Sequence, residues 1–407
     1  MKTTEQSLRT SKCLNFKEHD DKVEAYNVLN RKRYILTSGV FDILKFLEIP
    51  KSQKEILDLL QDVYDEGTIK DTIIYLVENK LIVENDHDET CHVFPTALPL
   101  FGIANYPSDK PIQPKIVFTG IPFGKGNGSD SNCMHFPAEL RNYLNQEHVN
   151  LGSSIDNINF QFLSSHIDFT TLKSHLKGGK LGDSGNLYLY PTEYSSSVYE
   201  KIYRTISKLL KEDIIPFTLG GDHSISYPII RAMNEKYDRF QVLQFDAHID
   251  TYDSIFSRML DGKISHHHGN FMAKCLKLEN LSHVYQYGIR GLSNIRPTIH
   301  SKQSYYWIDE LYPKVINVDE AAIDHDIPTY ITFDIDFLDP QTAPGTATPV
   351  PDGFLYRETC DLFEKLLKNS NIVGIDLVEV NPKLDNEKRT LQIAANIILL
   401  LLNYIKL

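Results

Sequence analysis

A short apolar segment passes directly into a polar cluster in the sequence Val242-Leu243-Gln244-Phe245-Asp246-Ala247-His248-Ile249-Asp250. Two more clusters follow apolar segments in the same way. They are Gly220-Gly221-Asp222-His223-Ser224 after residues 215–219, and Asp334-Ile335-Asp336-Phe337-Leu338-Asp339-Pro340 after residues 330–333. Buried parallel strands are apolar in this manner, and ligand sites of open α/β sheets lie at the carboxyl ends of the strands. We therefore expect the three clusters to converge at one edge of a sheet.

Further apolar segments recur from Ile116 onward and are separated by longer helical stretches. Three of them are residues 116–118, 187–189 and 372–375. Buried strands that alternate with helices indicate an α/β fold with a mainly parallel sheet.

The length of 407 residues suits a large catalytic domain with a small companion. The formal net charge of −12 argues against nucleic acid or an anionic membrane as a partner. Five scattered cysteines, with no paired spacing, favour a reducing cytoplasm. The N-terminus has no apolar signal core and residues 397–402 are too short to span a membrane. We expect a soluble cytoplasmic protein.

Residues 1–84 read as a small α/β unit. An extended segment at 23–29, a polar turn at 30–32 and a strand at 34–36 predict a hairpin. Apolar spacing then predicts helices at residues 40–47, 52–64 and 69–80, followed by a strand at 81–83. Ser52 with Glu55 predicts a capping box at the start of the second helix.

Residues 85–113 contain an acidic stretch and four prolines without clear periodicity, which is typical of a linker. The catalytic domain is accordingly expected to span residues 114–407. No internal repeat is evident.

The three polar clusters together offer two histidines and several aspartates. A single Asp-x-Asp at a strand end is more often a helix cap than a metal site, but capping does not explain three such clusters. Carboxylate oxygens mixed with imidazole favour manganese over cysteine-bound zinc, and four aspartates would balance the charge of two divalent ions. Two ions can lower the pKa of a shared water beside an electrophilic carbon, which indicates hydrolysis.

In order and spacing, the clusters resemble the signatures of the ureohydrolase family, which includes arginase, agmatinase and formiminoglutamase. The resemblance covers about residues 115–407 and implies the three-layer arginase/deacetylase fold, two Mn²⁺ ions, and a trimer or hexamer. The implied ligands of one ion are His223, Asp246, Asp250 and Asp334, and those of the other are Asp246, His248, Asp334 and Asp336.

The same resemblance implies catalytic or substrate-binding roles for four residues, one of which is the metal ligand Asp250. His268 precedes a glycine in a loop over the metals and could protonate the departing amine. Glu379 matches a glutamate that accepts hydrogen bonds from the guanidinium group. His268, Glu379 and Asp250 are thus the candidate catalytic residues, and Glu379 and Tyr252 the candidate substrate-binding residues. Without the resemblance, Glu379 would be read as a surface residue at a strand end.

Two features of the sequence bear on the substrate. Tyr252 stands where hydrolases of free arginine carry an asparagine that holds the substrate carboxylate, so the resemblance there is closer to agmatinases. His266 and His267 are more simply explained as a solvent-exposed polyhistidine loop.

The pattern of residues 1–84 resembles the winged-helix domains of the PqqD type, which recognise leader peptides on enzymes that modify ribosomally made peptides. This resemblance implies a peptide arginase, which converts arginine residues of a precursor peptide to ornithine. An unrelated winged-helix module for oligomerisation is the alternative for this unit. Alternatives for the whole chain are an agmatinase-like hydrolase of a small guanidino compound, a noncatalytic binding protein on the same scaffold, and a zinc deacetylase.

Overall fold

The chain forms two compact units, Met1–His92 and Val93–Leu407. The computed structural model describes residues 7–11, 13–19, 22–27, 32–84, 93–94, 96, 98–107, 113–147, 166–190, 193–252, 265–292, 300–311 and 323–407.

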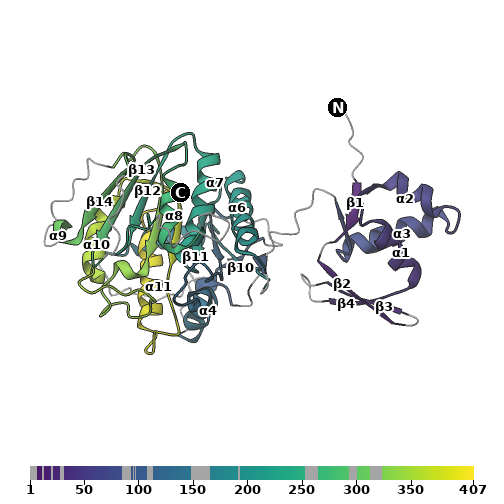
Figure 1. Ribbon diagram of the computed structural model, residues 1–407, viewed down its shortest axis with the longest axis horizontal. Coiled ribbons are helices and arrows are strands. Elements are labelled where there is room, and N and C mark those ends of the chain that lie inside the picture. The colour runs from purple at the N-terminus through teal and green to yellow at the C-terminus, as the bar shows by residue number, and fades with distance from the viewer. Residues whose placement is uncertain are drawn as a thin grey trace. The chain divides into compact units, whose positions relative to one another are not determined.

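Within its described residues, the N-terminal unit contains three helices and two small antiparallel sheets (Figure 1). One sheet has the strand order β2-β3-β4 and the other β5-β1-β6. Its elements are β1 (Ser7–Thr10), β2 (Leu14–His19), β3 (Lys22–Asn27), β4 (Lys32–Leu36), α1 (Ser38–Phe46), β5 (Lys51–Ser52), α2 (Gln53–Leu60), α3 (Glu66–Glu78) and β6 (Ile82–Glu84). Ile56 and Leu76 are fully buried in a core that the helices share with both sheets.

The predicted pattern of this unit is present, and the strands β1, β2 and β5 are additional. Strands β3 and β4 pair antiparallel, as the hairpin requires, although residues 28–31 of its turn lie outside the described part. Ser52 accepts a hydrogen bond from the Glu55 backbone, while the Glu55 carboxylate accepts one from the Ser52 backbone, so the capping box forms. Strands β1 and β2 precede residue 23, where the first strand was expected, because their polar sequences carry no strand signal.

The predicted linker at residues 85–113 is not wholly a linker. Strand β7 (Val93–Phe94) pairs antiparallel with β10 (Leu181–Leu187), and β8 (Ala104–Asn105) pairs parallel with the same strand. Both strands are two residues long, too short for a periodic pattern in the sequence. Residues 85–92 lie outside the described part of the chain.

The large unit is built on a ten-stranded sheet, and the expectation of an arginase-like α/β fold with a mainly parallel sheet is confirmed. The strand order is β14-β13-β12-β15-β16-β11-β9-β10-β7, with β8 beside β10, and β7 is antiparallel to its neighbour. The remaining strands are β9 (Ile116–Gly120), β11 (Ile215–Leu219), β12 (Phe240–Phe245), β13 (Leu281–Ile289), β14 (Gln303–Trp307), β15 (Pro328–Asp334) and β16 (Asn371–Val378).

The strand predicted at residues 187–189 lies earlier in the chain than expected. Strand β10 ends at Leu187 and contains Asp183 and Ser184, both buried. Asp183 is paired with Arg141 at 2.7 Å in the interior, so a polar strand is stable there. The apolar signal at 187–189 marked only the end of this strand.

Helices cover both faces of the sheet, which gives the three layers. The helices are α4 (Phe136–Gln146), α5 (Phe169–Lys177), α6 (Ser195–Lys211), α7 (Ser226–Lys236), α8 (Phe271–Cys275), α9 (Ile308–Leu311), α10 (Tyr356–Leu367) and α11 (Arg389–Leu402). Short 3₁₀ turns are η1 (Leu100–Gly102), η2 (Asn132–His135), η3 (His223–Ile225), η5 (His268–Asn270) and η8 (Ile335–Phe337).

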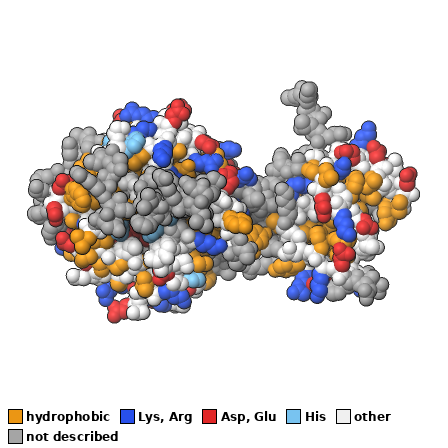
Figure 2. Space-filling model, in the orientation of Figure 1, with side chains coloured by type: hydrophobic (Ala, Val, Ile, Leu, Met, Phe, Trp, Pro, Cys, Tyr) orange, Lys and Arg blue, Asp and Glu red, His pale blue; other side chains and the backbone are white. Residues whose placement is uncertain are grey.

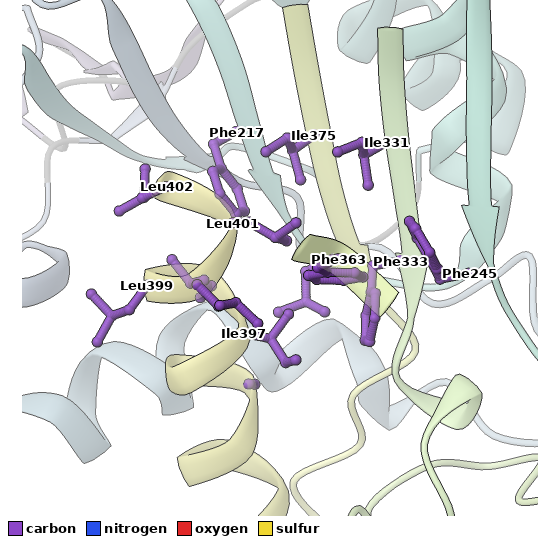
Figure 3. Close-up of a cluster of buried hydrophobic side chains, with 14 of the residues drawn as sticks. Phe217, Phe245, Ile331, Phe333, Phe363, Ile375, Ile397, Leu399, Leu401 and Leu402 are labelled. Atoms are coloured by element: carbon purple, nitrogen blue, oxygen red, sulfur yellow. The ribbon is translucent and has the colours of Figure 1, made fainter. Parts of the chain in front are cut away.

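Alternate residues of the central strands enter different cores. Phe245, Phe333 and Ile375 pack with α10 and α11 on one face, as Figure 3 shows. Val242 and Tyr330 pack with α6, α7 and α8 on the other face. Helix α11 is apolar on nearly every side and is buried along its length, as such a helix must be. Among the described residues, no helix is long and apolar enough to cross a membrane.

Candidate active site

Four neighbouring parallel strands, β12, β15, β16 and β11, bring the predicted clusters to one edge of the sheet. The chain leaves β11 through Gly220 and Gly221, whose φ angles are +37° and +90°. A Cβ atom on Gly221 would lie 2.3 Å from the Phe123 carbonyl oxygen. Only glycine fits this turn, which places His223 at the carboxyl end of the strand.

His223 lies at the centre of a group of carboxylates. Its Nδ1 atom is 3.2 Å from Asp246 Oδ2, 3.2 Å from Asp250 Oδ2 and 3.1 Å from Asp334 Oδ2. The His223 side chain is 1% exposed. The structure thus brings together all four residues that the resemblance implies for the first metal ion.

His248 lies in a second group, on the other side of Asp246. Its Nδ1 atom is 3.1 Å from Asp336 Oδ2 and 3.5 Å from Asp246 Oδ1. His223 with Asp246 and Asp334 forms one arrangement that could hold a metal ion, and Asp246 with His248 and Asp336 forms another. Asp246 is common to both.

The chemistry of these donors fits divalent cations. His223 Nδ1 is buried and has no hydrogen-bond partner, although three carboxylate oxygens surround it. Burial, followed by the charge of Asp246, raises the pKa of Asp250 to about 6. Such crowding of buried carboxylates is costly unless cations neutralise them, and oxygen with imidazole nitrogen is a donor set suited to manganese.

The other ring nitrogen of His223 belongs to a buried hydrogen-bond network. Thr332 Oγ1 donates to Asp376 Oδ1 at 2.6 Å, so its lone pair can accept from His223 Nε2 at 2.8 Å. Tyr330 donates to the second oxygen of Asp376 at 2.5 Å. This network fixes the proton of His223 on Nε2 and leaves the Nδ1 lone pair directed at the carboxylates, as a metal-binding histidine requires.

His268 and Glu379 lie together beside the His223 group. His268 Nδ1 is 3.3 Å from Glu379 Oε1, which also accepts a hydrogen bond from the His223 backbone at 2.9 Å. Burial alone would lower the pKa of His268, but the hydrogen bond and charge of Glu379 outweigh it and raise the pKa to about 9. Glu379 is 1% exposed, so it is not the surface residue that its position at a strand end would otherwise suggest.

The loop that contains His268 is held against the turn of His223. The His268 backbone donates to the Gly126 carbonyl at 3.1 Å. His266 Nε2 donates to the Ser224 carbonyl at 2.8 Å, and its ring lies 4.4 Å from that of Tyr199. The expectation of a solvent-exposed polyhistidine loop is therefore wrong: His266 and His267 are half-buried, and burial lowers the pKa of His266 to about 3. Aromatic packing makes that burial favourable.

Tyr252 lies beside the same loop. Its backbone donates to the Gly269 carbonyl at 2.9 Å, and a Cβ atom on Gly269 would lie 3.1 Å from the Tyr252 ring. The residue after His268 must therefore be small for the loop to approach Tyr252 this closely.

Several polar residues of the site lie outside the three clusters and were not predicted from the sequence. Asn127 donates to Glu379 Oε2 at 3.2 Å, and Thr332 with Asp376 supports His223. Thr332 and Asp376 interrupt otherwise apolar strands, and such interruptions beside a predicted ligand cluster would have singled them out. Asn127 lies in a loop and carries no comparable signal.

The family model described as the arginase family matches residues 114–403. The chain belongs to the arginase family. It is a hydrolase of guanidino C–N bonds from a manganese-dependent class, and the family typically has a dinuclear metal site.

Individual arginase-family proteins show the same relationship. The human protein named guanidino acid hydrolase, mitochondrial, is 31% identical over 295 residues, which are 69% of this chain and 75% of that protein. The chicken protein named agmatinase, mitochondrial, is 35% identical over 225 residues, 52% of this chain and 62% of that protein. Proclavaminate amidino hydrolase from Streptomyces clavuligerus shares the fold, with a TM-score of 0.60 at 24% identity, over 78% of this chain and 98% of that one.

Proposed function

We propose that the protein releases urea from a guanidino group with two Mn²⁺ ions and leaves an amine. Its support is the pair of histidine and carboxylate groups that share Asp246. The residues that would hold one ion are His223, Asp246, Asp250 and Asp334, and those for the other are Asp246, His248, Asp334 and Asp336. When bound, manganese would polarise the guanidino group and lower the pKa of water at the site.

The chain's own side chains would bind the guanidinium group and move protons. The Glu379 carboxylate is buried and charged, because its hydrogen bond to His268 outweighs burial and keeps its pKa below the usual range. It would attract the guanidinium cation through charge-assisted hydrogen bonds. His268 keeps a proton at neutral pH and would give it to the departing amine. Asp250, the third catalytic candidate, would accept a proton from water with its carboxylate.

For the substrate, we propose an arginine residue within a precursor peptide, and ornithine as the product. The backbone of Tyr252 is fixed beside Gly269, and its side chain lacks the amide with which free-arginine hydrolases bind a carboxylate. A peptide-bound arginine has no free α-carboxylate, so it does not need that amide. Tyr252 would then contact the neighbouring part of the peptide.

The N-terminal unit supports a peptide partner, because it is a compact unit of its own and precedes the arginase-family match. It exposes several large apolar side chains, which Figure 2 shows as orange areas on this unit. They include Ile35, Ile49, Leu59, Val63, Ile74 and Tyr75. An extended leader peptide could add to an edge of the β2-β3-β4 sheet and place its side chains against such a surface. Capture would then raise the local concentration of the arginine to the order of millimolar.

An agmatinase-like activity on a small free guanidino compound is the second candidate. It is favoured by the proteins named agmatinase, such as the chicken one at 35% identity. Agmatine also lacks a carboxylate, so Tyr252 is compatible with this substrate as well.

Comparing four substrates separates the two candidates. Urea release is measured from a long precursor peptide that joins a leader to an arginine-containing core, a short capped peptide with an internal arginine, free arginine and agmatine. Deletion of residues 1–84 should raise KM for the long peptide and leave the short peptide nearly unchanged. Ile74→Asp should act in the same direction, whereas Tyr194→Asp, at an exposed apolar residue of the large unit, should not. Strong activity on agmatine with none on any peptide would overturn the peptide substrate.

We also propose a cytoplasmic location and a homo-oligomer, either a trimer or a hexamer. Cys133, Cys275 and Cys360 are buried free thiols, which suits a reducing compartment. Light scattering of the purified full chain measures the oligomeric state.

A further inference from the structure

Three buried glutamines form a chain of amides across the strands beside the candidate metal groups. Gln244, Gln286 and Gln303 lie on the neighbouring strands β12, β13 and β14 (Figure 1). Gln303 Nε2 donates to Gln286 Oε1 at 2.5 Å, and Gln286 Nε2 donates to Gln244 Oε1 at 2.7 Å. Gln244 Nε2 then donates to Asp246 Oδ2 at 2.7 Å. The chain of amides therefore ends on Asp246, the aspartate that both metal groups share.

The orientation of every amide in this chain is determined by its ends. Asp246 and the Ile249 carbonyl can only accept hydrogen bonds, so the NH₂ groups of Gln244 and Gln286 must face them. Gln286 uses both hydrogens, one for Gln244 and one for Ile249 at 2.7 Å. All three amides thus point their NH₂ groups toward the metal groups. The amides hold the carboxylate of Asp246 through Gln244 and the backbone of the following turn, at Ile249, through Gln286.

Sheet stability does not explain these glutamines. Gln244 and Gln286 are fully buried, and a buried amide costs free energy unless every polar atom is paired. An apolar side chain would satisfy the packing of strands β12 and β13 without that requirement. The amides are therefore better explained by what they hold in place.

We propose that Gln244, Gln286 and Gln303 are positioning residues for Asp246 and thereby set the affinity of both metal sites together. This inference rests on the proposed dinuclear site. It differs from the role of Thr332, which contacts only His223 among the metal-binding candidates.

Titration of the metal-free full chain with Mn²⁺ by calorimetry tests this inference. Gln244→Met should weaken both binding steps by about 10- to 100-fold, the usual effect of losing a partner of a metal ligand. Gln286→Met should have a smaller effect, and Gln303→Met the smallest. Gln286→Glu keeps the acceptor but loses the donors, so it should resemble Gln286→Met.

Gln241 provides the matched control. It lies on β12 and is fully buried, and its amide donates to the Asp324 carbonyl at 2.7 Å and to Thr329 at 2.9 Å. Gln241→Met should lower the unfolding temperature while both Mn²⁺ affinities stay unchanged. If Gln244→Met does not fold, Gln303→Met still measures the effect on Mn²⁺ affinity, because Gln303 is the amide farthest from Asp246.

Wild-type affinity at both steps in Gln286→Met and Gln303→Met would overturn the positioning role, while the dinuclear site would stand. Equal loss of affinity in Gln241→Met would also overturn it, since the effect would then be general destabilisation. A wild-type chain that binds no divalent ion would overturn both this inference and the proposed function.

Discussion

His223 and His248 lie on opposite sides of Asp246, but the protein surrounds them differently. The His223 side chain is 1% exposed, faces three carboxylate oxygens and is fixed through Thr332 and Asp376. The His248 side chain is 28% exposed and faces two carboxylates. Buried, preorganised ligands lose less freedom on binding. We therefore expect the His223 site to bind its ion more tightly, and the His248 site to exchange its ion more readily.

The largest effect should come from removing Asp246, which belongs to both of the histidine and carboxylate groups. Asp246→Ala should abolish binding of both Mn²⁺ ions and urea release together, because each site loses a carboxylate and the remaining charge balance changes. Metal analysis and urea assays of the purified variant measure this. Asp339→Asn is the control, since Asp339 accepts hydrogen bonds from the backbone of Gln341 and Gly353 and belongs to neither group. A wild-type protein with full activity and one bound zinc would contradict the two-site comparison.

His268 belongs to neither metal group, so its removal should separate catalysis from metal binding. His268→Ala should slow urea release by roughly 10²–10⁴-fold, the usual contribution of a general acid, with both ions retained. His283→Ala is a suitable control because His283 lies on β13 and contacts Ser304. Wild-type rates in His268→Ala would show that another group protonates the amine.

Loss of the network behind His223 should affect only the tighter site. Thr332→Val removes the oxygen that accepts from His223 Nε2, and we expect about a 10- to 100-fold loss of affinity in the first Mn²⁺ binding step. The second step should change little. Thr205→Val is the control, since Thr205 is buried on helix α6 and donates to the Lys201 carbonyl instead. Equal weakening of both steps would mean that the two sites are not independently supported.

The smallest effect should be a shift in the titration of His268. Its pKa is raised from the ordinary 6.5 to about 9, so the ion pair with Glu379 stabilises the fold fully below pH 6.5 and is lost as the pH rises through 9. In Glu379→Gln the carboxylate charge is absent, so burial should lower the pKa of His268. Ring ¹⁵N shifts of His268 in the metal-free protein measure both values, and an unchanged pKa would exclude Glu379 as the cause.

The apolar strands and the clusters after them could be predicted from the sequence, because buried parallel strands are apolar and their carboxyl ends share one edge. Strand β10 was misplaced because Asp183 is buried with Arg141, and a pair so distant in sequence leaves no local pattern. The structure also brings Asp250 to His223 through a turn in which Asp250 has a φ of +50°, although the residue types alone do not specify that angle. His266 packs against Tyr199 of helix α6, which is distant in the sequence. The residues around His266 therefore do not indicate that it is buried.

The backbone of Glu379 adopts a φ of +60°, in the left-handed region that favours glycine. A non-glycine residue there costs on the order of 1–3 kcal/mol, in addition to the cost of burying its charge. Backbone conformation alone would thus favour glycine at this position under selection for heat resistance, against the ion pair with His268 that glutamate provides. The persistence of glutamate in a population under such selection would measure how strongly the activity itself is selected.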